Sequence, residues 1–261
     1  MTIPQLLKEL ERQSGQLDRR AVQSILAAFK QDEAVRALVQ ELLSLMLLRD
    51  PAARLRAAER MKQVAAALWP AAPAPLTLAL TQGVQLGGTV GLGMLATPAV
   101  TLEIVSPAVQ AAARATEARY LSYWGDQRAD HAARMGRIIT EALTVGGKRY
   151  PVRATIQEQL GVSRAKAAQL AQDGVLGALS AGQVAVWDTA RDDLGLKMEK
   201  TWLHSKKSQN ARPDHVALDG VTLDYGRDFI PGVLAYPRDP RGGARHGSRC
   251  KCSMICRVLD E

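Results

Sequence analysis

Two stretches near the C-terminal end decide the fold: residues 202–220 read WLHSKKSQNARPDHVALDG and residues 229–257 read FIPGVLAYPRDPRGGARHGSRCKCSMICR. They hold all three cysteines and three of the four histidines, with glycine and proline scattered between them. Short runs of aromatic and β-branched residues between turn formers are typical of strands. We therefore expect a small β-rich module after Thr201. Its expected strands cover residues 202–204, 221–223 and 253–258.

The module contains a candidate metal site made of His215, His246, Cys250 and Cys252. Imidazole and thiolate suit tetrahedral zinc, and a module with little core gains from such a staple. The C-x-C spacing is less specific for zinc than paired C-x-x-C motifs. In a second interpretation, His215 makes a structural hydrogen bond, for example to Asp239, and the cysteines are small buried apolar residues. A disulfide from Cys256 is the third, and a reducing compartment disfavours it.

The chain before this module is rich in alanine and leucine, and its apolar spacing predicts helices. We expect the first helix to break at Ser14-Gly15. Asp50 and Pro51 have the residue types of a helix N-cap and a first helical turn. Further helices are expected over residues 35–48, 107–143 and 178–200, the last interrupted near residue 195.

Residues 156–174 read IQEQLGVSRAKAAQLAQDG, with Ser163 as a candidate N-cap. The pattern is similar to a helix-turn-helix. A role in reading DNA requires base-contacting side chains on the second helix. We favour a hairpin of two helices within a helical bundle.

Residues 63–102 contain no charged residue. The part that reads WPAAPAP is typical of a linker. The part that follows has the length of a membrane span, but its threonines, glutamines and glycines lower its hydrophobicity. We expect a buried helix that packs closely through Gly83, Gly87, Gly88 and Gly91. Contact with a membrane after a conformational change is the alternative.

The composition restricts the class of protein. Of 261 residues, 47% are apolar and few are aromatic, which favours closely packed helices over a β-sandwich. The net charge of +8 favours an acidic partner such as nucleic acid. The first residues lack the pattern of a signal peptide, so a reducing compartment is expected.

The terminal motifs resemble those of phage head-morphogenesis proteins, the Mu F-like and SPP1-type minor head proteins. The family pattern runs W, then R-P-x-H-x-x-L-D-G, then Y-P-G-D-P, then C-R-C. Arg238 stands where the family has glycine, and Lys251 where it has arginine. The resemblance is carried by residues 200–257 and extends over 120–200. The matching residues singled out as structural are Trp202, Arg212, His215, Asp219, Gly220, Pro237, Asp239, Cys250 and Cys252.

The resemblance implies a structural minor head protein of a tailed bacteriophage, assembled in the host cytoplasm and located in the virion, in the head interior or at the portal vertex. It implies portal protein, major capsid protein or both as partners, with several copies per particle. Its implied roles are head assembly, DNA packaging or DNA ejection. The positive charge agrees with sequence-independent contact with packaged double-stranded DNA. Stable membrane association is not expected.

We therefore predict a mainly α fold with a small C-terminal α+β module. The predicted segments are an N-terminal helical region (1–69), a Pro/Gly-rich uncharged linker and buried helix (70–105), a helical domain with a hairpin (106–200), and the terminal module (201–261).

Two functional alternatives stay open. One is a nuclease or toxin-like effector, in which polar groups of the terminal module form an acid/base cluster. Its residues would be Arg212, His215, Asp219, Asp239 and His246. No nucleophile elbow, phosphate loop or H-E-x-x-H motif occurs in the sequence, so we do not expect an enzyme. The other is an ejected protein that contacts a membrane.

Overall fold

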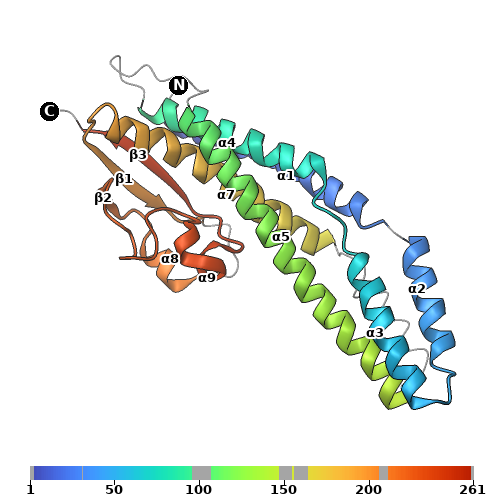
Figure 1. The fold of residues 1–261 in the computed structure, drawn as a ribbon. Coiled ribbons are helices and arrows are strands. Elements are labelled where there is room, and N and C mark those ends of the chain that lie inside the picture. The colour runs from blue at the N-terminus through green and yellow to red at the C-terminus, as the bar shows by residue number, and fades with distance from the viewer. Residues whose placement is uncertain are drawn as a thin grey trace. The chain divides into compact units, whose positions relative to one another are not determined.

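The protein is mainly helical and carries a small antiparallel sheet near its C-terminal end, which confirms the predicted fold class (Figure 1). The computed structural model describes residues 3–30, 32–95, 107–146, 155, 164–205 and 211–259. Its long helices are α1 (Ile3–Ala28), α2 (Asp32–Leu45), α3 (Pro51–Ala67), α4 (Ala74–Leu95), α5 (Pro107–Glu141) and α7 (Arg164–Asp192).

The chain forms two compact units, each assembled from segments far apart in the sequence. Unit 1 comprises Met1–Ala21, Pro75–Ala118 and Ala168–Glu261, and unit 2 comprises Val22–Ala74 and Arg119–Ala167. These boundaries fall inside helices, whereas the segments predicted above follow changes in composition. The division into those four segments stays a prediction.

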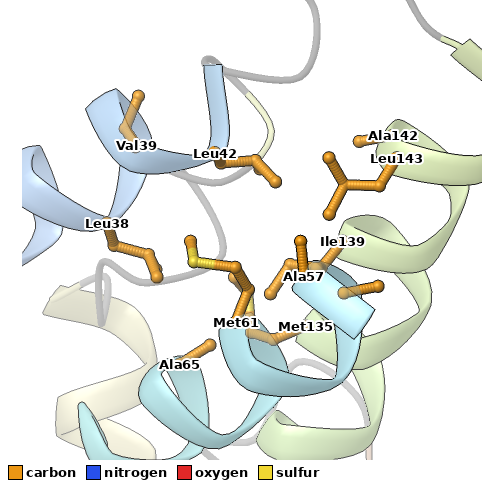
Figure 2. Close-up of a cluster of buried hydrophobic side chains, with 11 residues drawn as sticks. Leu38, Val39, Leu42, Ala57, Met61, Ala65, Met135, Ile139, Ala142 and Leu143 are labelled. Atoms are coloured by element: carbon orange, nitrogen blue, oxygen red, sulfur yellow. The ribbon is translucent and has the colours of Figure 1, made fainter. Parts of the chain in front are cut away.

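Unit 2 has a core formed by α2, α3, the C-terminal part of α5 and the π-helical turn η1 (Ala142–Gly146) (Figure 2). Asp50 starts α3 as the sequence predicts, because its carboxylate accepts hydrogen bonds from Ala52 N at 3.0 Å and Ala53 N at 3.1 Å. Pro51 occupies the first turn, where a missing N–H costs nothing. The core side chains are Leu38, Val39, Leu42, Ala57, Ala58, Met61, Ala65, Met135, Ile139, Ala142 and Leu143.

Aromatic rings hold the Pro-rich connection between α3 and α4 against unit 2. Trp69 is 5% exposed and meets Phe29 edge-to-face, with 4.9 Å between the ring centroids. Trp124 donates its indole N–H to Pro70 O at 2.9 Å. Edge-to-face rings and a satisfied indole N–H are favourable buried contacts. The stretch expected as a linker is therefore anchored at its start.

Most of helix α4, the Gly-rich part of the uncharged stretch, lies in unit 1 and packs against α7 through glycines. A Cβ added at Gly83 would lie 2.9 Å from the Cβ of Ala178, and one added at Gly91 would lie 3.1 Å from the Cα of Gln183. Trp187 donates its indole N–H to Gly91 O at 3.0 Å. The glycines thus let the two backbones approach more closely than side chains would permit. None of the helices in the described part of the chain combines the length and apolarity needed to cross a membrane.

Two helix predictions are wrong. First, α1 runs through Ser14, whose hydroxyl donates to Glu11 O at 3.1 Å, so local polar residues do not end the helix. Second, the predicted helix over 178–200 ends at Asp192. Gly195 takes a φ of 66°, the left-handed conformation that commonly follows a helix, and the chain then enters a strand. Residues 156–163, which hold the first helix and the turn of the predicted hairpin, lie outside the described residues.

The terminal module is built on a three-stranded antiparallel sheet with the order β2-β1-β3. Strand β3 (Ser253–Val258) has the predicted bounds, β2 (Thr222–Asp224) is displaced by one residue, and β1 (Met198–Leu203) begins earlier than predicted. Alternate residues of β1 are buried, with Met198, Lys200 and Trp202 on the inner face. Short helices α8 (Pro213–Ala217), η2 (Pro240–Gly242) and α9 (Gly243–Gly247) complete the module.

Candidate functional site

Trp202 is the hydrophobic centre of the terminal module. It is fully buried on the middle strand, and its ring lies edge-on to both His215 and Phe229, with 5.2 Å between centroids in each pair. A large aromatic ring on a central strand fixes the residues that pack against it. The tryptophan of the sequence pattern therefore positions one of the candidate metal ligands.

The R-P-D-H motif forms the start of α8. Pro213 occupies the first turn, and Arg212, just before it, donates from its guanidinium to Ser248 O. The Asp214 carboxylate accepts from His215 N at 3.0 Å. His215 is 1% exposed, so the motif delivers an imidazole into the interior of the module.

Each nitrogen of His215 faces a different set of groups. Its Nε2 lies 3.2 Å from His246 Nδ1, and the two rings are stacked with 12° between their planes. Its Nδ1 lies 3.6 Å from Cys250 Sγ and 3.7 Å from Cys252 Sγ. His246 also lies 3.5 Å from an Asp214 carboxylate oxygen. The imidazole of His215 thus separates a histidine on one side from a pair of thiols on the other.

The two thiols differ in their electrostatics. The hydrogen bond from Cys252 lowers the pKa of Cys250, and His215 and the Arg238 guanidinium lower it further. The same hydrogen bond and burial raise the pKa of Cys252. Cys256 is also buried, its Sγ lies 3.9 Å from Met198 Sδ, and burial raises its pKa to about 12. The three cysteines are free thiols.

The four residues predicted as metal ligands do not form one group. His215, Cys250 and Cys252 have ligand atoms within 4.8 Å of one another, and all three are buried. His246 instead belongs with Asp214 and the opposite nitrogen of His215. Burial contributes most to lowering the pKa of His246. Sequence spacing gave no indication of this division, because it depends on how the His215 ring is turned.

The polar residues expected to form an acid/base cluster are also divided. Asp219 accepts from His204 N at 2.9 Å and so fixes the end of β1. Asp239 accepts from Ala235 N at 2.8 Å and from Arg241, which stabilises the Y-P-R-D-P turn. The hydrogen bond suggested between His215 and Asp239 is wrong, because the two ring nitrogens of His215 face His246 and the two thiols. Pro237 is buried within the same turn, and Gly220 takes a φ of 77° in the turn before β2.

Arg238, which stands where the resembling pattern has glycine, is a structural residue that the pattern alone did not reveal. Its φ is 66°, a conformation that side chains rarely adopt. Its guanidinium donates to Leu176 O at 2.9 Å and Ser180 Oγ at 3.0 Å, both on α7, and to Cys250 O at 2.7 Å. In the sequence, arginine at a turn position where the resembling pattern has glycine was the feature that could have pointed to this role. Arg238 joins the terminal module to the long helix.

Asp173 makes a second connection from α7 to the terminal module. Its carboxylate accepts from Arg249 N at 2.6 Å and from Ser248 Oγ at 3.1 Å. Burial raises the pKa of Asp173, and these hydrogen bonds oppose that shift. The contacts fix the backbone directly before Cys250, so α7 determines where the first thiol lies.

Lys200 is a buried cation on the inner face of the sheet that sequence reasoning missed. It is 3% exposed and donates to Ala235 O at 2.8 Å. Its ammonium lies 5.2 Å from the Tyr225 ring centroid and 5.3 Å from that of Phe229. Burial lowers the pKa of Lys200 to about 8, although Asp228 favours the charged form. In the sequence, a lysine at a position that faces inward in the β1 alternation was the feature that could have revealed this buried cation.

Comparison with known proteins agrees with the terminal motifs. Residues 133–255 match the family model described as Phage Mu protein F like protein. A curated relative, the uncharacterized protein YqbB of Bacillus subtilis (strain 168), is 30% identical over 128 residues. That alignment covers 47% of this chain and 40% of the relative, so the chain matches less than half of the relative's length. No solved structure matches the chain.

Proposed function

Because residues 133–255 match the family model described as Phage Mu protein F like protein, we propose that this chain is a structural minor head protein of a tailed bacteriophage. The family is one of phage head morphogenesis. The proposed location is the virion, in the head interior or at the portal vertex, after assembly in the host cytoplasm. The proposed partners are the portal protein, the major capsid protein or both, in several copies per particle.

The hydrogen bonds made by the residues of the terminal motifs support a structural function. Arg212 donates to a backbone carbonyl, Asp219 accepts from a backbone N–H, and Asp239 stabilises a turn. A catalytic cluster requires these groups to converge on one position that a substrate can reach. They are instead distributed over the module and engaged with its own backbone. This favours a docking module over the nuclease alternative.

Assembly of the chain into phage heads tests the proposal. Co-expression with the portal and major capsid proteins encoded by the same phage should give particles that retain the chain after density-gradient purification. Mass spectrometry of those particles measures its copy number. The Gly182→Ala variant, in which the packing of α4 on α7 is disturbed, controls for passive enclosure and should be depleted. A chain that is absent from purified particles and captures neither partner contradicts the proposal.

The proposed contact with packaged DNA is supported by exposed cations. The chain has a net charge of +8, and α5 carries arginines that are all exposed. On α3, by comparison, Arg60 pairs with Glu41 at 2.7 Å and Lys62 with Glu59 at 2.6 Å. Cations that neutralise phosphates release counterions, which makes binding dependent on salt. The exposed arginines of α5 are Arg114, Arg119, Arg128, Arg134 and Arg137.

We expect the double variant Arg128→Gln, Arg134→Gln to weaken binding to double-stranded DNA equally for unrelated sequences. The slope of log K against log salt should fall by about 0.9 for each phosphate that the variant no longer neutralises. Fluorescence anisotropy at several salt concentrations measures this slope. Arg191→Gln is the matched control, because Arg191 is already paired with Asp192 at 2.6 Å. A wild-type chain whose binding is independent of salt contradicts DNA contact through these arginines.

A further inference from the structure

The C-x-C pair presents both of its sulfur atoms on one side of an extended backbone. Cys250 is 3% exposed and Cys252 is 4% exposed, whereas Lys251 between them is exposed. Side chains alternate between the two faces of extended backbone, so residues two apart share a face. The C-x-C spacing, which is not specific for zinc in a sequence, therefore places the two thiols together just before β3.

The three facing donor atoms have the separations of a tetrahedral metal site. With Zn–S of about 2.3 Å and Zn–N of about 2.0 Å, a tetrahedral ion holds sulfur and nitrogen about 3.5 Å apart. His215 Nδ1 lies 3.6 Å from Cys250 Sγ and 3.7 Å from Cys252 Sγ. All three donor atoms lie within 4.8 Å of one another. Little rearrangement is needed for them to share one ion.

The surroundings of His215 orient the nitrogen that would bind the ion. A histidine that ligates through Nδ1 carries its proton on Nε2, and that N–H is usually donated to a neighbouring acceptor. Here the acceptor is His246 Nδ1, 3.2 Å away. Trp202 lies edge-on to the His215 ring at 5.2 Å between centroids. His246 thus orients the ligand, in contrast to the ligand role predicted for it from the sequence.

A small cavity borders the three donor residues. Its volume is about 10 Å³, close to the space of a single water molecule or ion. His215, Cys250 and Cys252 border it, and so does His204 at the end of β1. The backbone of Ser205 hydrogen-bonds to Cys252, which brings this segment against the thiols. Among the residues that border the cavity, His204 is the one imidazole besides His215.

We propose that His215 Nδ1, Cys250 Sγ and Cys252 Sγ bind one zinc ion, with His204 as the fourth ligand. This inference does not depend on the proposed function. Two thiolates favour zinc over the hard cations that prefer oxygen ligands. The group formed by Asp214, His215 and His246 is the less suitable one for zinc, because it offers no thiolate and would occupy the other nitrogen of His215.

Metal analysis of the full-length chain, purified under reducing conditions, tests the site. Inductively coupled plasma mass spectrometry should find about one zinc per chain. The Cys250→Ser and Cys252→Ser variants should each lower bound zinc by more than about tenfold. Cys256→Ser is the matched control, because it removes a buried thiol of the same sheet that faces Met198, and it should keep its zinc. A wild-type zinc content below about 0.2 per chain overturns the proposal.

Binding of Co²⁺ in place of zinc tests the same site in the wild-type chain, even if a cysteine variant fails to fold. The wild-type chain titrated with Co²⁺ should develop thiolate-to-cobalt charge-transfer bands and the visible bands of a tetrahedral ion. His246→Gln, which keeps an acceptor for His215, should retain these bands. In His204→Ala, water would take the fourth position, so the visible bands should shift. An unchanged spectrum overturns the fourth-ligand assignment. A Cys250–Cys252 disulfide in the reduced preparation, detected by thiol counting, overturns the whole site.

Discussion

Replacing Gly182 by alanine is expected to destabilise the packing of α7 against α4 by about 3 kcal/mol, at the upper end of typical overpacking costs. The added Cβ would overlap Val84 O and would lie 2.8 Å from Gly88 N. These neighbours are backbone atoms of a helix, so they move only if the helix itself shifts. Equilibrium urea unfolding, together with hydrogen exchange of the α4 amides, measures the loss of stability.

Gly177→Ala provides the matched control on the same helix. An added Cβ at Gly177 meets no atom within 4 Å. Because glycine is a poor helix former, this substitution should be neutral or stabilise the chain by up to about 1 kcal/mol. Equal effects of the two substitutions would show that the close approach of α4 and α7 does not contribute to stability.

Arg238→Ala is expected to cost about 3 to 4 kcal/mol, because hydrogen bonds from a charged donor contribute more than neutral ones and the acceptors are left without it. The hydrogen bonds that it removes go to Leu176 O, Ser180 Oγ and Cys250 O. Two of these acceptors belong to α7 and one belongs to the candidate metal site. The change should therefore loosen the terminal module from the helix. Thermal unfolding and proteolysis between α7 and the module measure the effect.

Arg238→Gly separates the guanidinium from the backbone conformation. Both variants lack the hydrogen bonds, but glycine adopts a φ of 66° without the steric cost that alanine meets there. The glycine variant should thus be more stable than the alanine variant by about 1 kcal/mol. If alanine were equal to or more stable than glycine, the left-handed conformation at this position would be contradicted.

The head-protein proposal and the zinc proposal rest on different observations. The head-protein proposal depends on the match of residues 133–255 to the family model, whereas the zinc proposal depends on donor atoms within the terminal module. Loss of the ion should loosen α8 and the start of β3, because zinc binding energy contributes directly to folding. A chain without zinc that still enters particles would leave the family-based proposal standing.

Local features of the chain were predicted well from the sequence. Asp50 and Pro51 start a helix because their side chains act on backbone groups within three residues. Strand β3 has the predicted bounds because turn formers precede an alternating run. The break expected at Ser14 failed because burial of the apolar face of α1 outweighs the weak local preference of serine and glycine.

The candidate site was only partly predictable from the sequence, because its geometry depends on contacts between residues far apart in the chain. The sequence identified His215, Cys250 and Cys252 as ligand types, and alternation along the backbone places the two thiols on one face. It also identified His246, but the spacing along the chain carries no information about which side of an imidazole a residue will reach. Arg238 was hidden because its partners on α7 lie more than fifty residues away in the sequence.

The sequence by itself thus determined the helical class, the terminal β module and the family motifs, since each depends on residue types within a few positions of one another. Only the tertiary structure decided that His215 turns Nδ1 to the thiols and Nε2 to His246. That orientation results from the meeting of α8, α9 and the segment before β3 at His215, whose ring packs edge-on against Trp202. Long-range packing fixes side-chain direction, and side-chain direction selects which donor atoms can share an ion.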